Sequence, residues 1–116
     1  MFNYTLLETN QIQYYPILEV DELPSGEQMF FSIGNLSIVL FHIGEAYYAI
    51  ADVCSHDNGP VGEGELIGTE IKCPRHGARF DLTSGKALSM PARVDIPAYP
   101  VRVKEGQIEV GLPKKE

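Results

Sequence analysis

The sequence predicts an all-β fold, an antiparallel sandwich or barrel, and two observations carry that prediction. Apolar runs are short, and Gly, Pro and Asn interrupt them at intervals of about 8–12 residues. No stretch has the length and the capping residues of a helix of about ten residues. The chain has 116 residues, which suits a single domain with its own hydrophobic core.

Four strands are expected before the first cysteine, at residues 14–20, 28–34, 36–43 and 46–52. Gly34-Asn35 is a pair typical of two-residue hairpins, so the second and third strands should be neighbours. Residues 36–43 are almost all apolar, as expected for a strand covered on both faces. Gly44-Glu45 puts Gly at the first turn position, which favours a type II′ hairpin into the fourth strand.

The second half of the chain continues the pattern of short strands. Residues 64–73 return as a short hairpin, and 78–82 form a strand before a segment rich in proline. The segment 99–110 predicts a final hairpin around Glu105-Gly106. Residues 1–12 fit the scheme least well, and we expect them to form an extra strand or a frayed end.

Charge and hydropathy exclude several partners. The net charge is −7 and the pI is about 4.9, which disfavours nucleic acid and anionic membranes but permits a partner with a basic face. The first residues lack the basic and apolar regions of a secretory signal, and no stretch approaches the ~18 apolar residues that cross a bilayer. We therefore expect a cytoplasmic protein, in which cysteines serve as ligands or free thiols.

Both cysteines, and two of the three histidines, fall within residues 54–76. They form the pairs Cys54-x-His56 and Cys73-x-x-His76, with sixteen residues between the pairs. Two thiolates and two imidazoles can hold zinc, which would make the chain a zinc-stabilised β module without a redox role. They can also hold a [2Fe–2S] cluster, if each pair sends its Cys to one iron and its His to the other.

The residues around the two pairs suit tight loops. Gly59, Gly62 and Gly64 should let the first loop fold closely and bring backbone N–H groups near anionic sulfur. Pro60 and Pro74 should stiffen the two loop tips. The hairpin between the two Cys/His pairs should bring the two loops close together in space.

The stretch from CSH to CPRHGARFDLTSGKA is similar to the cluster motif of Rieske proteins, C-x-H-x16–17-C-P-x-H-G, and the resemblance covers roughly residues 14–111. It implies a single Rieske domain over 1–116, with a small cluster-binding subdomain of two hairpin loops at about 53–82. It also implies one Rieske-type [2Fe–2S] cluster per chain. The residues that match the ligands of the motif are Cys54, His56, Cys73 and His76.

The resemblance implies an electron carrier that is not an enzyme by itself. The chain looks like the ferredoxins that carry single electrons from a flavin-dependent reductase to a terminal Rieske non-haem iron oxygenase of the ring-hydroxylating type. With two histidines assigned to the cluster, only His42 remains, too few for the 2-His-1-carboxylate iron site of an oxygenase. Docking would occur near His56 and His76, with the chain a monomer. The alternative is a small Rieske-like subunit of an assimilatory nitrite reductase.

The same resemblance predicts a low reduction potential. High-potential Rieske proteins carry an additional disulfide between the loops, and its positions here hold Gly59 and Arg75. Those proteins also have Ser and Tyr hydroxyls that donate to the cluster sulfurs, where this chain has Ala78 and Phe80. Fewer donors stabilise the reduced state less, so we expect a potential near about −150 mV, at the low end of the Rieske range.

The neighbouring polar residues have simpler interpretations. His42 lies in a strand and should be a structural or surface histidine. Asp57 is interpreted as a solvated loop charge, with tuning of the site or docking of a partner as the alternative. Arg75 is interpreted as an exposed charge, with a partner contact as the alternative. Pro91 is interpreted as a lid that shields the cluster. The acidic residues Glu63, Glu65 and Glu70 are interpreted as ordinary polar surface, with a docking face as the alternative.

Overall fold

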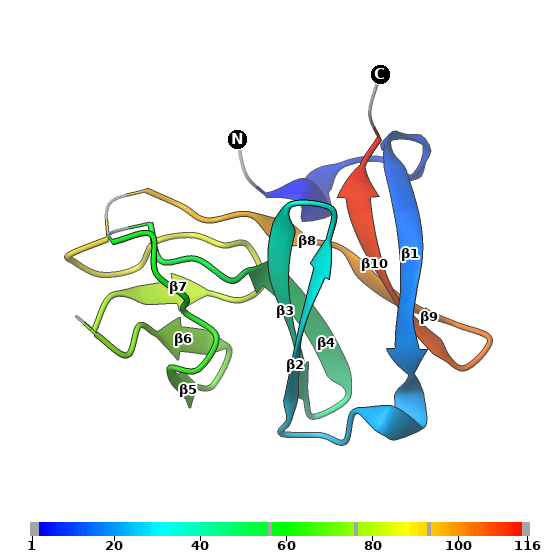
Figure 1. Cartoon of the computed structure of the whole chain (residues 1–116), viewed down its shortest axis with the longest axis horizontal. Helices are drawn as coiled ribbons and strands as arrows, with labels where there is room; N and C mark the ends of the chain where they lie inside the picture. Colours follow the sequence, from blue (N-terminus) through cyan, green and yellow to red (C-terminus); the bar gives the residue numbers. More distant parts are fainter. Residues whose placement is uncertain (1–2, 56, 76, 93, 115–116) are drawn as a thin grey trace.

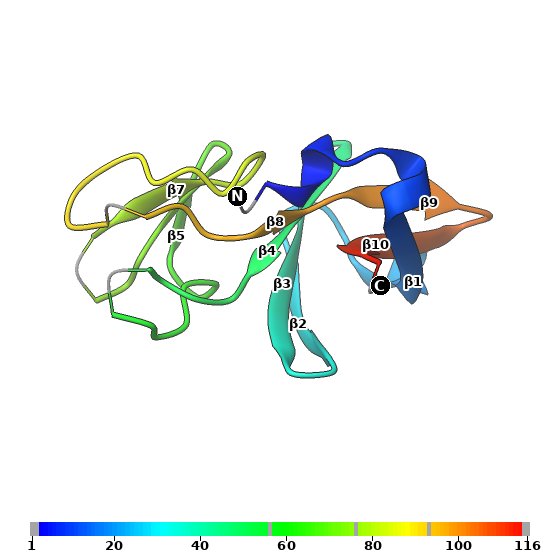
Figure 2. The ribbon, with the colours of Figure 1, turned by 90° about the horizontal axis from the view of Figure 1, so that it is seen from above.

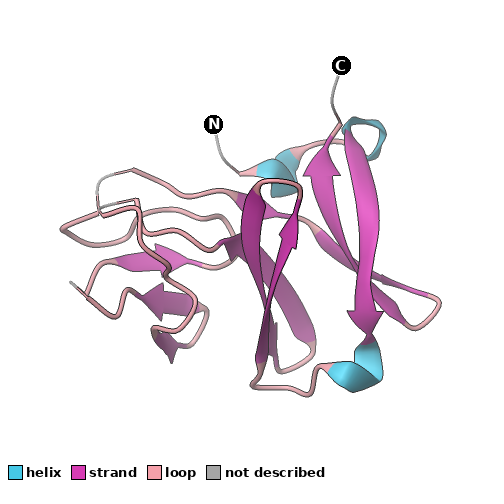
Figure 3. Cartoon of the chain, in the orientation of Figure 1, coloured by secondary structure: helices cyan, strands magenta, loops and turns pink. Residues whose placement is uncertain are grey.

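The computed structural model describes residues 3–55, 57–75, 77–92 and 94–114 (Figure 1). These residues form ten strands and three short 3₁₀ helices: η1 (Tyr4–Leu6), η2 (Thr9–Gln11), β1 (Ile12–Glu19), η3 (Val20–Glu22), β2 (Gln28–Ile33), β3 (Leu36–Ile43), β4 (Ala46–Ala51), β5 (Glu65–Ile67), β6 (Glu70–Lys72), β7 (Arg79–Asp81), β8 (Ala98–Tyr99), β9 (Val101–Lys104) and β10 (Gln107–Pro113). Strands dominate the chain, and the predicted all-β class is confirmed (Figure 3). In the part of the chain that is described, no helix is long and apolar enough to span a membrane.

The strands form three antiparallel sheets, ordered β1-β10-β9, β2-β3-β4-β8 and β5-β6-β7. The sheet of β2, β3 and β4 lies in the middle of the molecule, with β5–β7 on one side and β1, β9 and β10 on the other (Figures 1 and 2). The small sheet β5-β6-β7 falls within the predicted cluster-binding range 53–82. The assignment of 1–116 to a single domain stays a prediction.

Strand β3 explains how two cores share one sheet. Alternate side chains of a strand point to opposite faces. Val39 and Phe41 accordingly pack into the core that also contains the two cysteines, while Ile38 and Leu40 pack into the core under β10. All four are fully buried. The prediction that this strand is covered on both faces is therefore confirmed for its central residues.

The predicted hairpins are confirmed by their pairing register. Ile33 faces Leu36 across Gly34-Asn35, and Ile43 faces Ala46 across Gly44-Glu45. Lys104 faces Gln107 across Glu105-Gly106, and Ile67 faces Glu70 in the hairpin between the cysteines. The conformation of such a turn depends on the two or three residues within it, so a short stretch of sequence is enough to predict it.

The prediction for the N-terminal segment is wrong for the residues that are described. Residues 4–6 and 9–11 form 3₁₀ turns, and a single parallel bridge joins Asn3 to Ala98. Tyr4 stacks on Tyr99 with ring centroids 5.5 Å apart. The segment is thus held to the sheets by this bridge, by the aromatic contact and by the hydrogen bond from the Lys114 N–H to the Gln11 carbonyl, and it is neither an additional strand nor a free end. Residues 1–2 lie outside the described residues.

Candidate metal centre

The first cysteine loop, residues 54–59, is closed by two backbone hydrogen bonds at Cys54. The Cys54 N–H donates to the Gly59 carbonyl at 2.7 Å, and the Cys54 carbonyl accepts from the Asn58 N–H at 2.7 Å. Asn58 has a φ of 63°, a left-handed conformation that Asn tolerates better than most residues. The loop therefore bends back on itself within six residues and leaves the cysteine at its base.

The second cysteine loop, residues 73–78, repeats the same arrangement. The Cys73 N–H donates to the Ala78 carbonyl at 2.7 Å, and the Cys73 carbonyl accepts from the Gly77 N–H at 3.1 Å. Gly77 has a φ of 77°, at the position in the loop that corresponds to Asn58. Two loops with one hydrogen-bonding pattern thus present one cysteine each.

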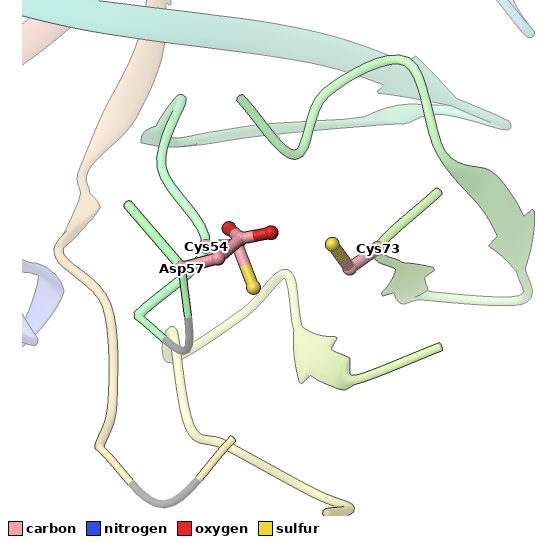
Figure 4. A group of neighbouring side chains, drawn as sticks. All are labelled: Cys54, Asp57 and Cys73. Atoms are coloured by element: carbon pink, nitrogen blue, oxygen red, sulfur yellow. The ribbon is translucent and has the colours of Figure 1, made fainter. Parts of the chain in front are cut away.

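The two thiols are buried and lie close together. Cys54 is 0 % exposed and Cys73 is 2 % exposed. Their Sγ atoms and a carboxylate oxygen of Asp57 all lie within 4.8 Å of one another (Figure 4). Two sulfurs bound to one tetrahedral metal ion would be about 3.8 Å apart, given metal–sulfur bonds of about 2.3 Å. The donor set therefore fits the case in which both thiolates bind the same metal ion.

On the side that faces the interior, the surroundings of the thiols are apolar. Cys54 and Cys73 belong to a core cluster that includes Val61, Ala78 and Phe80, each 0 % exposed. Neither Ala78 nor Phe80 carries a hydroxyl. The interior side of the site thus excludes water and offers sulfur no side-chain hydroxyl from these two positions.

The two predicted imidazole ligands, His56 and His76, lie outside the described residues. Their sequence positions place them two residues after Cys54 and three residues after Cys73, between the hydrogen-bonded ends of the two loops. Their role as ligands stays a prediction.

Asp57 and Arg75 are partly exposed, as interpreted from the sequence, but they also form an ion pair with each other that was not predicted. Arg75 Nε lies 2.5 Å from Asp57 Oδ2, and Arg75 Nη2 lies 2.9 Å from Asp57 Oδ1. This two-point ion pair connects one cysteine loop to the other. The hydrogen bond to Asp57 raises the pKa of the Arg75 guanidinium above its usual value. Opposite charges shortly after each cysteine were the one sequence signal that could have suggested the pair.

The N–H groups of three glycines of this region bond to oxygen: Gly59 to Asp57 Oδ1, Gly62 to Asp52 Oδ1 and Gly64 to the Val61 carbonyl. That the loop brings backbone N–H groups near anionic sulfur stays a prediction. Close packing is confirmed for Gly59, where a Cβ would lie 2.8 Å from Arg75 Cζ. A larger residue at this position would therefore require the Arg75 guanidinium to shift.

Asp52 is a structural residue of the site that the sequence analysis missed. Its Oδ1 accepts the N–H groups of Val61 at 3.0 Å and Gly62 at 2.8 Å. The carboxylate, at the end of strand β4, therefore holds the segment that follows the first cysteine loop. No local pattern in the sequence distinguishes this aspartate from a surface charge.

A third segment, between β7 and β8, lies against the cysteine loops. The Ser55 hydroxyl donates to the Val94 carbonyl, which ties the first loop to this segment. The Ser89 hydroxyl accepts the Arg79 N–H at 3.1 Å and fixes the start of the segment on β7. Pro91 stands between these two attachments, and its role as a lid stays a prediction.

The structural interpretation of His42 is confirmed. Its Nδ1 lies 2.7 Å from the Leu23 carbonyl oxygen, and its ring stacks on Tyr47 with centroids 4.2 Å apart. Among the acidic residues, Glu70 pairs with Arg79 at 3.5 Å, while Glu63 and Glu65 are exposed.

The family model of the Rieske [2Fe-2S] domain matches residues 13–100, which is most of the chain. This chain belongs to the Rieske [2Fe–2S] domain family. Membership implies a Rieske-type [2Fe–2S] cluster, and the paired thiols described above fit that cofactor. The Rieske fold predicted from the motif is therefore confirmed, and zinc becomes the weaker interpretation of the same donors.

Three proteins with similar sequences or structures show which kinds of Rieske protein this chain is similar to. The 3-phenylpropionate/cinnamic acid dioxygenase ferredoxin subunit of Escherichia coli (strain K12) is 39% identical over 108 residues, covering 92% of this chain and 98% of the relative. A chain in the solved complex of reduced oxygenase and oxidised ferredoxin in carbazole 1,9a-dioxygenase is 29% identical, with a TM-score of 0.79, covering 89% of this chain and 96% of that one.

The third relative bears on the alternative assignment. It is the solved structure of a putative NADH-dependent nitrite reductase small subunit from Mycobacterium tuberculosis, which is 23% identical with a TM-score of 0.78, covering 90% of this chain and 98% of that one. At this identity the likeness shows the fold alone.

Proposed function

We propose that this chain is a low-potential Rieske-type ferredoxin, which carries single electrons from a flavin-dependent reductase to a terminal Rieske non-haem iron oxygenase. The observation that carries the proposal is the pair of buried thiols on two matched loops of a Rieske domain. The similarity to a dioxygenase ferredoxin subunit over nearly the whole of both chains supports the oxygenase as acceptor.

We propose that Cys54, His56, Cys73 and His76 hold the cluster. When bound, the cluster supplies one-electron chemistry. The two cysteines supply thiolates from the buried side of the site, where Ala78 and Phe80 keep out water. The two histidines follow them in the same loops and would supply the remaining donors. Two imidazoles in place of two thiolates leave the centre less negative, which favours accepting an electron.

Transient docking should occur around the tips of the two cysteine loops, near His56 and His76. An electron carrier needs a small and weak interface with each partner, because it must release one before meeting the other. We also propose that the protein is a monomer and that it works in the cytoplasm, where thiols stay reduced until they bind iron.

The first test is of the cofactor and its ligands. Anaerobically purified protein should contain iron and acid-labile sulfide and should give the electron paramagnetic resonance signal of a reduced Rieske centre. His56→Ala and His76→Ala should each abolish that signal. His42→Ala, which alters a histidine bonded to the Leu23 carbonyl, should retain it. A colourless protein with stoichiometric zinc would refute the redox assignment.

The second test is of the electron transfer route. Reductase, this chain and candidate oxygenases are combined, and product formation is measured with and without the chain. Turnover that depends on the chain with an oxygenase supports the proposal. Turnover only with a nitrite reductase catalytic subunit would replace the oxygenase assignment with the alternative.

A further inference from the structure

Among the described residues, the ion pair of Asp57 with Arg75 joins the tips of the two cysteine loops. Asp57 stands three residues after Cys54, and Arg75 stands two residues after Cys73. The guanidinium meets the carboxylate at two points, 2.5 Å and 2.9 Å. Such two-point contacts are stronger and more directional than a single charged hydrogen bond. The side chains are 35% and 22% exposed, so water screens the pair only in part.

Each partner of this pair is fixed in its position by the first loop. Asp57 Oδ1 also accepts the Gly59 N–H at 3.0 Å, and this hydrogen bond orients the carboxylate towards Arg75. The Arg75 guanidinium packs against Gly59 so closely that a Cβ there would lie 2.8 Å from its Cζ. The contact between the loops is therefore both ionic and steric.

The pair also lies beside the thiols. A carboxylate oxygen of Asp57 and the sulfurs of Cys54 and Cys73 lie within 4.8 Å of one another, and the Cys73 sulfur faces the other two groups (Figure 4). The Arg75 guanidinium bonds to this carboxylate at two points and so holds the tip of the second loop, beside Cys73, to the tip of the first loop, beside Cys54.

We propose that Asp57 and Arg75 form an ionic clamp that closes the two cysteine loops against each other and keeps both thiols in position to hold the cluster. The inference rests on the proposed function in one respect, since the cluster is what the thiols hold. Asp57 and Arg75 are thus positioning residues. Without the clamp, the loop tips would separate more often and expose the cluster to solvent.

The test uses the full chain with its cluster and the variants Asp57→Asn, Arg75→Gln and the double variant. Asp57→Asn keeps an oxygen for the Gly59 N–H and removes only the charge. With an iron chelator present, cluster absorbance should decay about three- to tenfold faster in each single variant. The double variant should be no worse than the worse single variant, because both changes remove one shared contact.

Two comparisons show whether the effect is ionic and local. Raising the ionic strength should speed cluster loss in the wild type but not in the double variant, since salt screens only an intact ion pair. The matched control is Glu70→Gln with Arg79→Gln, which removes the 3.5 Å ion pair between β6 and β7. Its side chains are 38% and 39% exposed, similar to the exposure of Arg75, and the cluster should persist as in the wild type.

A readout that needs no cluster separates this inference from the proposed function. Hydrogen exchange of the Cys54, Asn58, Cys73 and Gly77 amides, which close the two loops, should accelerate in the Asp57 and Arg75 variants. Amides in the sheet of β1, β10 and β9 should keep their exchange rates.

Three results would overturn the clamp. One is unchanged cluster decay and unchanged loop exchange in both variants, and another is an equal acceleration of exchange in all three sheets. The third is a change confined to electron transfer with the oxygenase, which would make the pair a docking feature. A protein that lacks iron and sulfide would refute the proposed function alone, because loop exchange would still report on the clamp.

Discussion

The burial of Tyr99 makes the free energy of unfolding depend on pH. The side chain is 3% exposed and stacks against Tyr4. Burial, with a smaller effect from the charge of Tyr4, raises the pKa of Tyr99 to about 12 from an ordinary value of 10.0. The folded state therefore holds the phenol proton more tightly than the unfolded state. This contribution is complete below about pH 10 and is lost as the pH rises towards about 12.

Alkaline unfolding of a Tyr99→Phe variant tests this assignment. Between about pH 9 and pH 11, the wild type should lose about 1 kcal/mol more unfolding free energy than the variant, which has no phenol to ionise. Urea denaturation of both proteins at the two pH values measures the difference. Equal losses in the two proteins would show that the raised pKa of Tyr99 does not contribute.

Ala78 and Phe80 are the residues that should set a low reduction potential. Both are fully buried in the same core cluster as the two cysteines, and neither can donate a hydrogen bond from its side chain. The reduced centre is the more anionic state and gains most from donors, so their absence should keep the potential below zero, near about −150 mV. Protein-film voltammetry measures it. A potential above about +100 mV would contradict the argument.

The loop elements depend on side chains that replace regular secondary structure. Between Asp52 and strand β5 the chain forms turns, so its backbone N–H groups need partners other than a sheet. The Asp52 carboxylate provides one oxygen for two of them, at Val61 and Gly62. The position of strand β4 therefore determines the path of the segment that follows the cysteine loop.

Asp52→Ala should destabilise this segment. Two partly buried N–H groups would lose their acceptor, which should lower the free energy of unfolding by about 1–3 kcal/mol. Asp52→Asn retains an acceptor oxygen and should lose less than half as much. Urea denaturation of the three proteins provides the comparison, and equal stability of wild type and Asp52→Ala would disprove the role.

The whole molecule carries a net negative charge that should influence its encounters with partners. The net charge is −7, and Glu63 and Glu65 are exposed close to the cysteine loops in sequence. A protein with this charge is steered towards a partner whose docking face is basic, and salt weakens that steering. The acidic composition thus bears on the rate of association rather than on the fold.

Stopped-flow reduction of the oxygenase by this chain tests the steering. The second-order rate constant should fall several-fold when ionic strength rises from about 0.01 M to about 0.5 M, because the Debye length shortens from about 30 Å to a few ångströms. Cluster absorbance is recorded at both salt concentrations to confirm that the centre is intact. A rate constant that rises with salt would mean that like charges meet at the interface.

Local chemistry is what the sequence determined by itself. The cysteines and histidines of residues 54–76 predicted the metal centre, because ligand type and spacing can be recognised in the sequence itself. The structure describes only the two cysteines of the set. The hairpins at Gly34-Asn35 and Glu105-Gly106 were predictable for the same reason, because a two-residue turn depends on the residues within it.

Contacts between distant residues were decided only by the tertiary structure. Tyr4 and Tyr99 are far apart in the sequence, and nothing in the sequence near either residue indicates that their rings stack. The opposite charges of Asp57 and Arg75 are compatible with an ion pair, but only the structure shows that the two side chains meet. Strand β3 could be predicted as buried, but not which of its faces belongs to which core. Side-chain packing and ion pairing depend on positions in space, and those positions are set by the whole chain at once.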